Sequence, residues 1–136
     1  MEFTGKKDVD TALSALGEQL SAISIDVIDL LVCGGAGLHV LGMISRTTKD
    51  VDVVAIVSHN SSNQLILGTA KPLPLSLVEA AKKVERDFQL KDGWINPGPT
   101  SALDFGLPEG VLDRAETHTY GKHLIVRFIS RYDQIF

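Results

Sequence analysis

The sequence predicts a single α/β domain of the α+β kind, in which a small mixed central sheet carries helices packed on it. Three observations predict this class: an apolar stripe with helical spacing near the N-terminus, short β-prone apolar runs before residue 60, and a final run that alternates apolar residues. The 136 residues suffice for one core. We expect 1–136 to be one domain truncated at its C-terminal end, because 131–136 resembles the opening turn of another helix.

The composition excludes several classes of protein. With 44% hydrophobic and 22% charged residues, the chain has the balance of a folded globular protein. A net charge of −4 without a dense Lys/Arg block gives no general attraction for nucleic acid. Nucleic acid is therefore possible only as a substrate whose end is modified. Cys33 is the sole cysteine, which excludes an internal disulfide. The charged N-terminus and the lack of an apolar run of about 18 residues predict a cytoplasmic protein without a membrane partner.

An amphipathic helix is expected first. Its apolar stripe recurs at spacings of four, three, four and three residues. The stripe consists of Val9, Leu13, Leu16, Leu20 and Ile23. Asp8 or Asp10 is the expected N-terminal cap. Gly17 lies inside this helix and costs about 1 kcal/mol relative to alanine.

A buried strand and a short helix are expected next. Val27–Cys33 is β-prone and ends at the Gly34-Gly35 pair. Ala36–Met43 is mostly apolar and predicts a helix that starts directly at the glycines. The polar segment Arg46–Lys49 then predicts a turn.

A second strand is expected from Asp50 to Val57. Because side chains alternate along a strand, two faces are expected. One face carries Val51, Val53, Ala55 and Val57, and the other carries Asp52, Val54 and Ile56, with Asp50 in line.

The second half of the chain predicts a loop, a helix and a last strand. Ser58–Gln64 has the composition of a surface loop. Ser76 followed by Glu79 forms a capping-box pattern for a helix. The inner side of that helix is expected to carry Val78, Ala81, Val84 and Phe88. Segment 93–108 is rich in Pro and Gly, and His123–Ser130 is the expected last strand.

Asp50 and Asp52 are the candidate metal ligands. Residues two apart on a strand have Cα atoms about 6.6 Å apart and project from the same face. Two carboxylates aimed into one volume repel each other unless a cation neutralises them. Mg²⁺ is commonly bound by one or two carboxylates together with substrate phosphates. The acidic pair therefore predicts a magnesium site.

The Gly34-Gly35 turn is the candidate phosphate site. Glycines let the backbone approach a ligand closely, and the N-terminus of the following helix directs N–H groups at it. Arg46 lies in the turn before the acidic strand and could offer a bidentate fork to phosphate. Together these features suit a metal-bound nucleotide.

The segments VCGG (32–35) and RTTKDVDV (46–53) resemble the polymerase-beta-type nucleotidyltransferase superfamily, closest to its bacterial branch of AbiEii-like toxins and uncharacterised relatives. The resemblance implies a nucleotidyltransferase-like fold that transfers a nucleoside monophosphate from an NTP to an acceptor hydroxyl. It implies that Gly34 and Gly35 contact the triphosphate and that the catalytic residues Asp50 and Asp52 bind Mg²⁺. Arg46 and Thr48 match the R-x-T-x-D-x-D variant of this branch and are expected at the nucleotide.

Three functions remain open at this point. The first is the Mg²⁺-dependent enzyme, whose acceptor is an RNA end, a protein or a small molecule. The second is a catalytically degenerate domain that binds a nucleotide or another protein, because the superfamily usually supplies a third carboxylate and the last strand contains none. The third is the toxin of a toxin–antitoxin pair, which follows from the resemblance alone and would imply an antitoxin partner. A homo-oligomer is compatible with each.

Simpler structural roles compete with these functional ones. Asp50 and Asp52 could form the solvent side of an edge strand, and the glycine pair could be only a turn. Arg46 suits a surface ion pair equally well, and Thr48 suits a turn or cap. The Trp94-Ile95-Asn96 triplet could receive a base, although an aromatic anchor that pins the loop to the core is the favoured interpretation.

Overall fold

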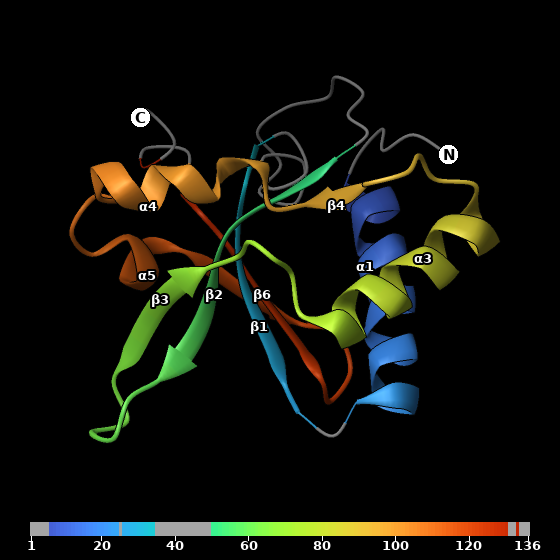
Figure 1. Ribbon diagram of the computed structural model, residues 1–136, viewed down its shortest axis with the longest axis horizontal. Coiled ribbons are helices and arrows are strands. Elements are labelled where there is room, and N and C mark those ends of the chain that lie inside the picture. Colours follow the sequence, from blue (N-terminus) through green and yellow to red (C-terminus); the bar gives the residue numbers. More distant parts are fainter. Residues whose placement is uncertain (1–5, 25, 35–49, 131–132, 134–136) are drawn as a thin grey trace.

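A six-stranded mixed sheet forms the centre of the protein (Figure 1). The structure, a computed structural model, describes residues 6–24, 26–34, 50–130 and 133. The strand order is β3-β2-β1-β6-β5, and β4 pairs with β2 beside this path. The strands are β1 (Ile28–Cys33), β2 (Val51–His59), β3 (Leu65–Thr69), β4 (Ile95–Asn96), β5 (Glu116–Thr119) and β6 (Leu124–Phe128). A mixed sheet with packed helices is what the sequence predicts at the level of fold class.

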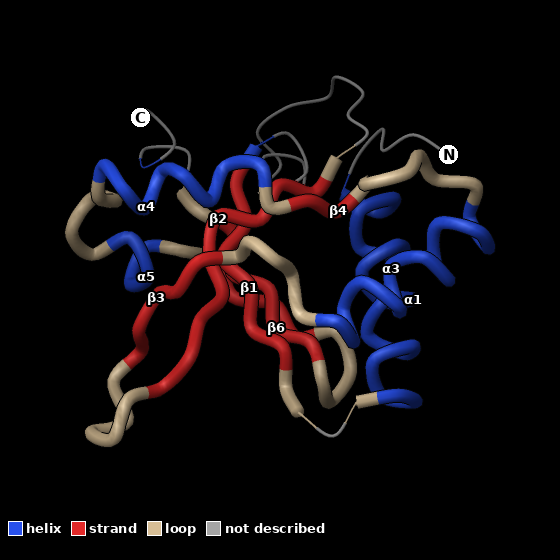
Figure 2. Tube along the Cα trace, in the orientation of Figure 1, coloured by secondary structure: helices blue, strands red, loops and turns tan. Residues whose placement is uncertain are grey.

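Helices cover both faces of this sheet (Figure 2). The two long helices, α1 (Lys6–Ile23) and α3 (Leu75–Phe88), pack together on one side. The short elements lie on the other side and are η1 (Gly98–Ser101), α4 (Ala102–Phe105) and α5 (Val111–Arg114). Each face therefore has its own apolar cluster, and the sheet separates the two. No helix among the described ranges combines the length and apolar character needed to cross a bilayer.

Helix α1 buries the predicted stripe. Val9, Leu13, Leu16 and Leu20 are fully buried, whereas Ile23 at the helix end is 38% exposed. The predicted cap is wrong, because the helix already begins at Lys6. Asp8 instead lies in the first turn, where a negative charge favours the helix dipole.

Gly17 has a packing role that its helix propensity does not reveal. A Cβ added at residue 17 would overlap the backbone carbonyl oxygen of Tyr120. Helix α1 therefore approaches the turn between β5 and β6 closely at this point. Tyr120 also donates a hydrogen bond from its hydroxyl to Asp10 (2.7 Å), which ties the same turn to α1.

Strands β1 and β6 confirm two sequence predictions. β1 lies inside Val27–Cys33, and β6 lies inside His123–Ser130. The alternating residues Leu124, Val126 and Phe128 are fully buried. Because β1 and β6 are parallel, their C-terminal ends meet at the same edge of the sheet.

A β-bulge interrupts the pairing of β1 with β2. Leu31 is opposite Ala55, whereas its neighbour Val32 is opposite Val53, so Val54 is the extra residue in β2. A bulge of this kind shifts the alternation of side chains by one position.

The predicted faces of β2 are consequently wrong. Val51 and Val53 pack in the cluster beneath α1 and α3. Ala55 and Val57 pack in the opposite cluster, together with the bulged Val54. Ile56 packs against the first cluster rather than sharing a face with Val54. Sequence periodicity could not reveal this, because the extra residue is defined only by the partner strand.

Helix α3 differs from its prediction in its start. It begins at Leu75, its cap is Pro74, and no side chain caps it, so the expected capping box of Ser76 and Glu79 is wrong. Its buried residues are Leu77, Ala80, Ala81 and Val84. The predicted Val78 and Phe88 are only partly buried.

Several short strands were not expected. β2 continues through His59, two residues into the predicted loop Ser58–Gln64, and a turn then leads into β3. Asn60 shapes this turn, since its Oδ1 accepts hydrogen bonds from the backbone of Ser62 and Gln64 (both 2.9 Å). β4 and β5 were also missed. The predicted helix Ala36–Met43, the turn Arg46–Lys49 and most of 131–136 lie outside the described residues.

Candidate functional site

The end of β1 and the start of β2 meet at Gly34 and Asp52. Asp52 is the register partner of Cys33, the last residue of β1. Gly34 follows with a φ of +80°, a left-handed conformation that favours glycine. Oδ2 of Asp52 occupies the space that a side chain at residue 34 would take. A glycine at this position therefore allows the carboxylate to lie directly against the turn.

Trp94 brings β4 to the same place. Its side chain is 1% exposed, and its indole N–H donates to the Ala81 carbonyl of α3 (3.0 Å). Its own carbonyl accepts from the backbone N–H of Val51 (2.5 Å). The aromatic ring is thus a buried anchor, as favoured from the sequence. This anchor sets the register in which Asn96 pairs with Asp52.

Asn96 orients the Asp52 carboxylate. Its Oδ1 accepts a hydrogen bond from the backbone N–H of Gly98 (2.9 Å). The amide therefore presents its Nδ2, a donor, to Oδ1 of Asp52 (3.1 Å). The Gly98 contact fixes the orientation of the Asn96 amide, because only its oxygen, and not its nitrogen, can accept a hydrogen bond from a backbone N–H.

Asp50 lies just before β2 and is paired with a lysine. Lys91 Nζ contacts Asp50 Oδ1 at 2.9 Å. Lys91 follows α3 and precedes the Trp94 anchor, so its position depends on the packing of that segment. Both side chains remain solvent-accessible, with 48% of Lys91 and 37% of Asp50 exposed. The pair is therefore an exposed ion pair at the rim of the site.

The surroundings of Asp52 disfavour its charged form. Burial raises the pKa of the Asp52 carboxyl above its ordinary value, and the hydrogen bond from Asn96 opposes this shift. The negative charge of Asp50 also raises the pKa of Asp52, whereas the charge of Lys91 lowers it. The electrostatic effect of Asp50 on Asp52 indicates that the two carboxylates share one region. Such a pair is stabilised by a cation.

Cys33 is a buried thiol beside this region. It is 8% exposed. Burial raises the pKa of its thiol to about 12, and the charge of Asp52 acts in the same direction. Burial and the Asp52 charge therefore favour the protonated thiol, which disfavours a role as an activated nucleophile.

The structure places some of the predicted site residues and leaves others undescribed. Gly34 and Asp52 are in direct proximity, and Asp50, two residues before Asp52, raises the pKa of the Asp52 carboxyl through its charge. The predicted nucleotide-binding residues Gly35, Arg46 and Thr48 lie outside the described residues.

Sequence reasoning missed two contributions. Asn96 belongs to the Trp94-Ile95-Asn96 triplet, whose composition is compatible with base binding and does not indicate that the amide orients a carboxylate. Nothing in the sequence indicates that Lys91 contacts Asp50, apart from its position three residues before Trp94.

The two carboxylates fit a cation that takes its remaining ligands from water and a substrate. Among the described residues, no group of three or more His, Cys, Asp or Glu side chains is arranged to hold a metal ion. Two carboxylates beside a turn without a side chain suit Mg²⁺, which usually retains waters and phosphate oxygens in its coordination shell. The described residues therefore fit a shared site and not an all-protein cage.

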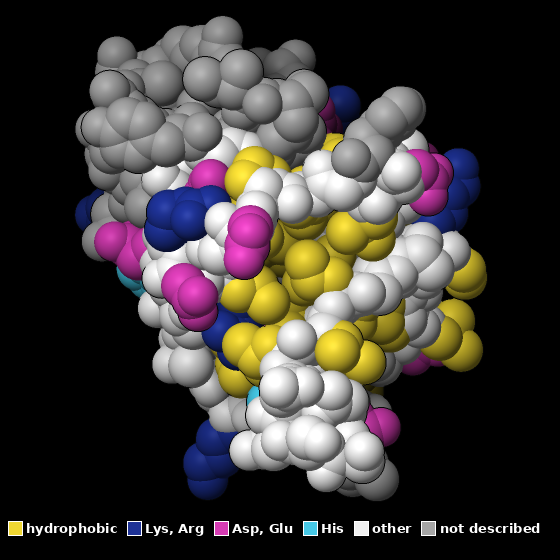
Figure 3. All heavy atoms as spheres, turned by 90° about the vertical axis from the view of Figure 1, so that its left-hand side faces the viewer, with side chains coloured by type: hydrophobic (Ala, Val, Ile, Leu, Met, Phe, Trp, Pro, Cys, Tyr) yellow, Lys and Arg dark blue, Asp and Glu magenta, His cyan; other side chains and the backbone are white. Residues whose placement is uncertain are grey.

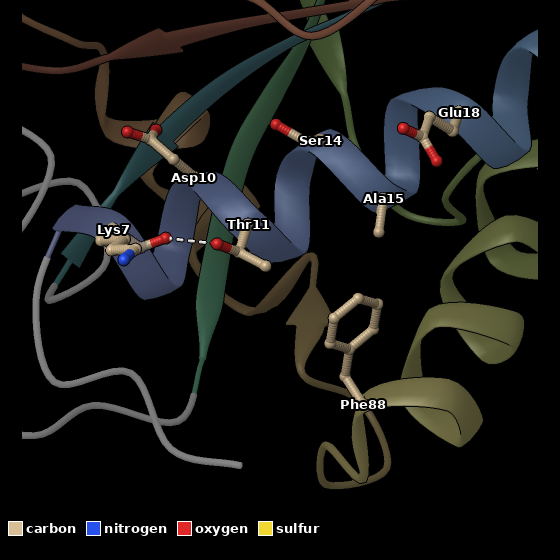
Figure 4. A pocket seen from close by; sticks show the side chains of 7 residues that line it. All are labelled: Lys7, Asp10, Thr11, Ser14, Ala15, Glu18 and Phe88. Carbon is tan, nitrogen blue, oxygen red and sulfur yellow. Dashed lines mark hydrogen bonds between the residues drawn. The ribbon is translucent and has the colours of Figure 1, made fainter.

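A separate hollow of about 660 Å³ lies between α1 and the end of α3 (Figure 4). It is lined by Lys7, Asp10, Thr11, Ser14, Ala15, Glu18 and Phe88. Thr11 donates its hydroxyl hydrogen to the Lys7 carbonyl (2.7 Å), and Asp10 accepts from Tyr120. Because these polar groups serve the fold, this hollow is a weaker candidate than the acidic site.

An apolar area lies on the side of the molecule that carries β3, α4 and α5. Figure 3 shows hydrophobic side chains gathered near the centre of this view. Partly buried leucines of this side include Leu65, Leu67, Leu103 and Leu112. A hollow of about 420 Å³ beside them is lined by residues 64–65 and 110–113. Asp113 is the one charged residue among the described residues of its lining, so it lacks the convergent charges of the acidic site.

Comparison of the chain with models of known protein families, with curated proteins and with solved structures found no match. The residues of the site and the motif resemblance therefore carry what can be inferred about function.

Proposed function

We propose that this chain is a nucleotidyltransferase-like domain that holds a Mg²⁺-bound nucleoside triphosphate and transfers its nucleoside monophosphate to an acceptor hydroxyl. The observation that carries the proposal is the contact between the glycine turn and the acidic strand. Gly34 and Asp52 are 18 positions apart in the sequence, yet the Asp52 carboxylate lies against the Gly34 backbone. This is the arrangement that a phosphate turn and a metal ligand need in order to serve one ligand.

The residues would divide the work as follows. Asp50 and Asp52 would hold Mg²⁺. When bound, the ion would stabilise the negative charge of the phosphates and activate the attacking hydroxyl oxygen. Asn96 keeps Oδ1 of Asp52 in a hydrogen bond and so restricts the rotation of the carboxylate. Gly34 permits close approach of the backbone. Gly35, Arg46 and Thr48 are proposed phosphate contacts on the basis of the motif resemblance alone.

A second function is favoured by the identity of Asn96. The side chain that β4 places on Asp52 is a neutral amide, which can orient a carboxylate but cannot accept a proton from an attacking hydroxyl. Two carboxylates suffice to bind a metal-nucleotide complex. The alternative is therefore a domain that binds the nucleotide without transferring it.

Calorimetric titration with Mg²⁺-ATP and Mg²⁺-GTP tests the binding that both functions share. The wild-type chain is compared with Asp50→Asn/Asp52→Asn, which removes both charges at nearly constant volume. Asp26→Asn/Asp113→Asn is the matched control, because it removes two exposed carboxylates elsewhere. We expect binding by wild type and control and a loss of at least about tenfold in the site variant. Equal heats for all three proteins would refute the nucleotide site.

Transfer of the labelled α-phosphate distinguishes the two functions. The protein is incubated with Mn²⁺ or Mg²⁺, an α-labelled NTP and acceptors of three classes: RNA ends, proteins and small hydroxyl compounds. Covalent label that depends on Asp50 and Asp52 supports the enzyme. Nucleotide binding without covalent label under every condition supports the non-catalytic domain.

A further inference from the structure

We propose that Lys91 is a displaceable counter-ion, which pairs with Asp50 when the acidic site holds no metal and leaves it when a divalent cation binds. This inference rests on the proposed function and adds a residue that the motifs do not contain. It follows from the geometry, the charge and the exposure of the Lys91–Asp50 pair.

The geometry places the lysine on one carboxylate only. Lys91 Nζ lies 2.9 Å from Asp50 Oδ1, whereas the described hydrogen-bond partner of Asp52 is Asn96. The Lys91 backbone is held separately, since its carbonyl accepts from the Trp94 N–H (3.2 Å). A change of the side chain therefore need not move the loop. The ammonium occupies a position that a cation on Asp50 would need.

The charges make the two occupants mutually exclusive. When both are ionised, Asp50 and Asp52 carry two negative charges, and Lys91 compensates one of them. A divalent ion on the same oxygens would compensate both and would repel the neighbouring ammonium. Lysine is a point charge on a flexible stem, so it can swing away without rearrangement of the backbone.

The exposure of the pair makes the exchange easy. An ion pair that is 48% and 37% exposed is weak, because water screens it and ordering two side chains costs entropy. Removing Lys91 should therefore strengthen cation binding only about two- to fivefold.

Binding of Mn²⁺ alone, measured by calorimetry or by electron paramagnetic resonance of the free ion, tests the inference. Lys91→Met removes the charge and keeps the length of the side chain. Lys83→Met is the matched control, because Lys83 is an exposed lysine of α3. We expect Lys91→Met to bind Mn²⁺ about two- to fivefold more tightly than wild type and Lys83→Met to remain near wild type.

Lys91→Arg tests whether the positive charge at residue 91, and not any change of the loop, lowers the affinity for Mn²⁺. Arginine keeps the charge and can hold a carboxylate with two hydrogen bonds, so its Mn²⁺ affinity should equal or fall below that of wild type. Unchanged or weaker Mn²⁺ binding by Lys91→Met would overturn the inference while leaving the metal site intact. Absence of Mn²⁺ binding in every variant would instead refute the proposed function and the inference together.

Discussion

Oδ2 of Asp52 lies where the side chain of residue 34 would otherwise be, so Gly34 and Asp52 depend on each other. The relationship joins two strand ends through one carboxylate and one missing side chain. Gly34 also has a φ of +80°, which a residue with a Cβ adopts at a cost. Both properties favour glycine at this position, for different reasons.

Substitution of Gly34 by alanine should therefore damage the site more than the fold. The left-handed conformation should cost about 1–2 kcal/mol in the free energy of unfolding. The new methyl group should also displace the Asp52 carboxylate and weaken Mn²⁺ binding. Urea denaturation and Mn²⁺ titration measure the two effects. Gly68→Ala is the control, because a Cβ there meets its nearest neighbour, the Ile56 carbonyl, only at 3.9 Å. Unaltered Mn²⁺ affinity in Gly34→Ala would contradict the assignment.

Asp52→Asn should make the protein more stable at neutral pH. Because the pKa of Asp52 is raised in the folded state, its stability contribution is fully present below the unfolded-state pKa and is lost as the pH rises through the folded-state pKa. The ionised carboxylate is therefore a net cost at pH 7, which asparagine removes while keeping an acceptor for Asn96. We expect a higher melting temperature at pH 7 and a smaller difference near pH 3.

Mg²⁺ provides a further check on Asp52. A cation that binds the ionised carboxylate should stabilise wild type and not Asp52→Asn, so the two melting temperatures should converge as Mg²⁺ is added. A lower melting temperature for Asp52→Asn at pH 7 without Mg²⁺ would show that the carboxylate stabilises the fold.

Gly17→Ala should destabilise the protein, although alanine is the better helix former by about 1 kcal/mol. The new Cβ would overlap the Tyr120 carbonyl oxygen, which belongs to the backbone and cannot rotate away. We expect a net loss of about 1–3 kcal/mol, typical of overpacking, in chemical denaturation. Ser14→Ala on the exposed side of α1 is the control and should be neutral or slightly stabilising. A gain in stability from Gly17→Ala would rule out the close packing of α1 on the β5–β6 turn.

Asp29 and Arg127 should be coupled in stability. They form a double hydrogen-bonded ion pair between β1 and β6 (2.9 and 2.8 Å), with side chains 8% and 15% exposed. Removing Asp29 leaves the partly buried Arg127 charge without its carboxylate, so Asp29→Ala should cost about 1.5–3 kcal/mol, the range of hydrogen bonds to charged groups. The double variant Asp29→Leu/Arg127→Met should recover most of that loss, because it removes both charges and retains apolar volume. Additive losses in a double-mutant cycle would show that the two residues act independently.

The sequence was sufficient for elements whose apolar pattern is local. The stripe of α1 and the alternation of β6 are read from neighbours along the chain, and both are buried except for Ile23 at the end of α1. β3 and β5 lacked such a pattern, because most of their residues are exposed. β5 is also only four residues long, too short to show a clear alternation. A short strand is stabilised by its partner rather than by its own residues, which is why propensity did not reveal it.

The candidate site likewise contains residues that the sequence predicts and residues that only the fold brings to it. The glycine turn and the two aspartates were recognisable because their chemistry and spacing lie within one stretch of about twenty residues. Asn96 and Lys91 come from another part of the chain, and the buried Trp94 places them beside Asp52 and Asp50. Nothing local to KDGWIN specifies which acids it will meet.

By itself, the sequence determined the α/β class, the main helices and strands, and the residue types available for metal and phosphate binding. Only the tertiary structure decided the bulge at Val54, the need for glycine at residue 17 and the neighbours of the acidic pair. The reason is physical. Periodicity reports the environment of one segment, whereas a bulge, a close approach and an ion pair are properties of two segments that meet only after folding.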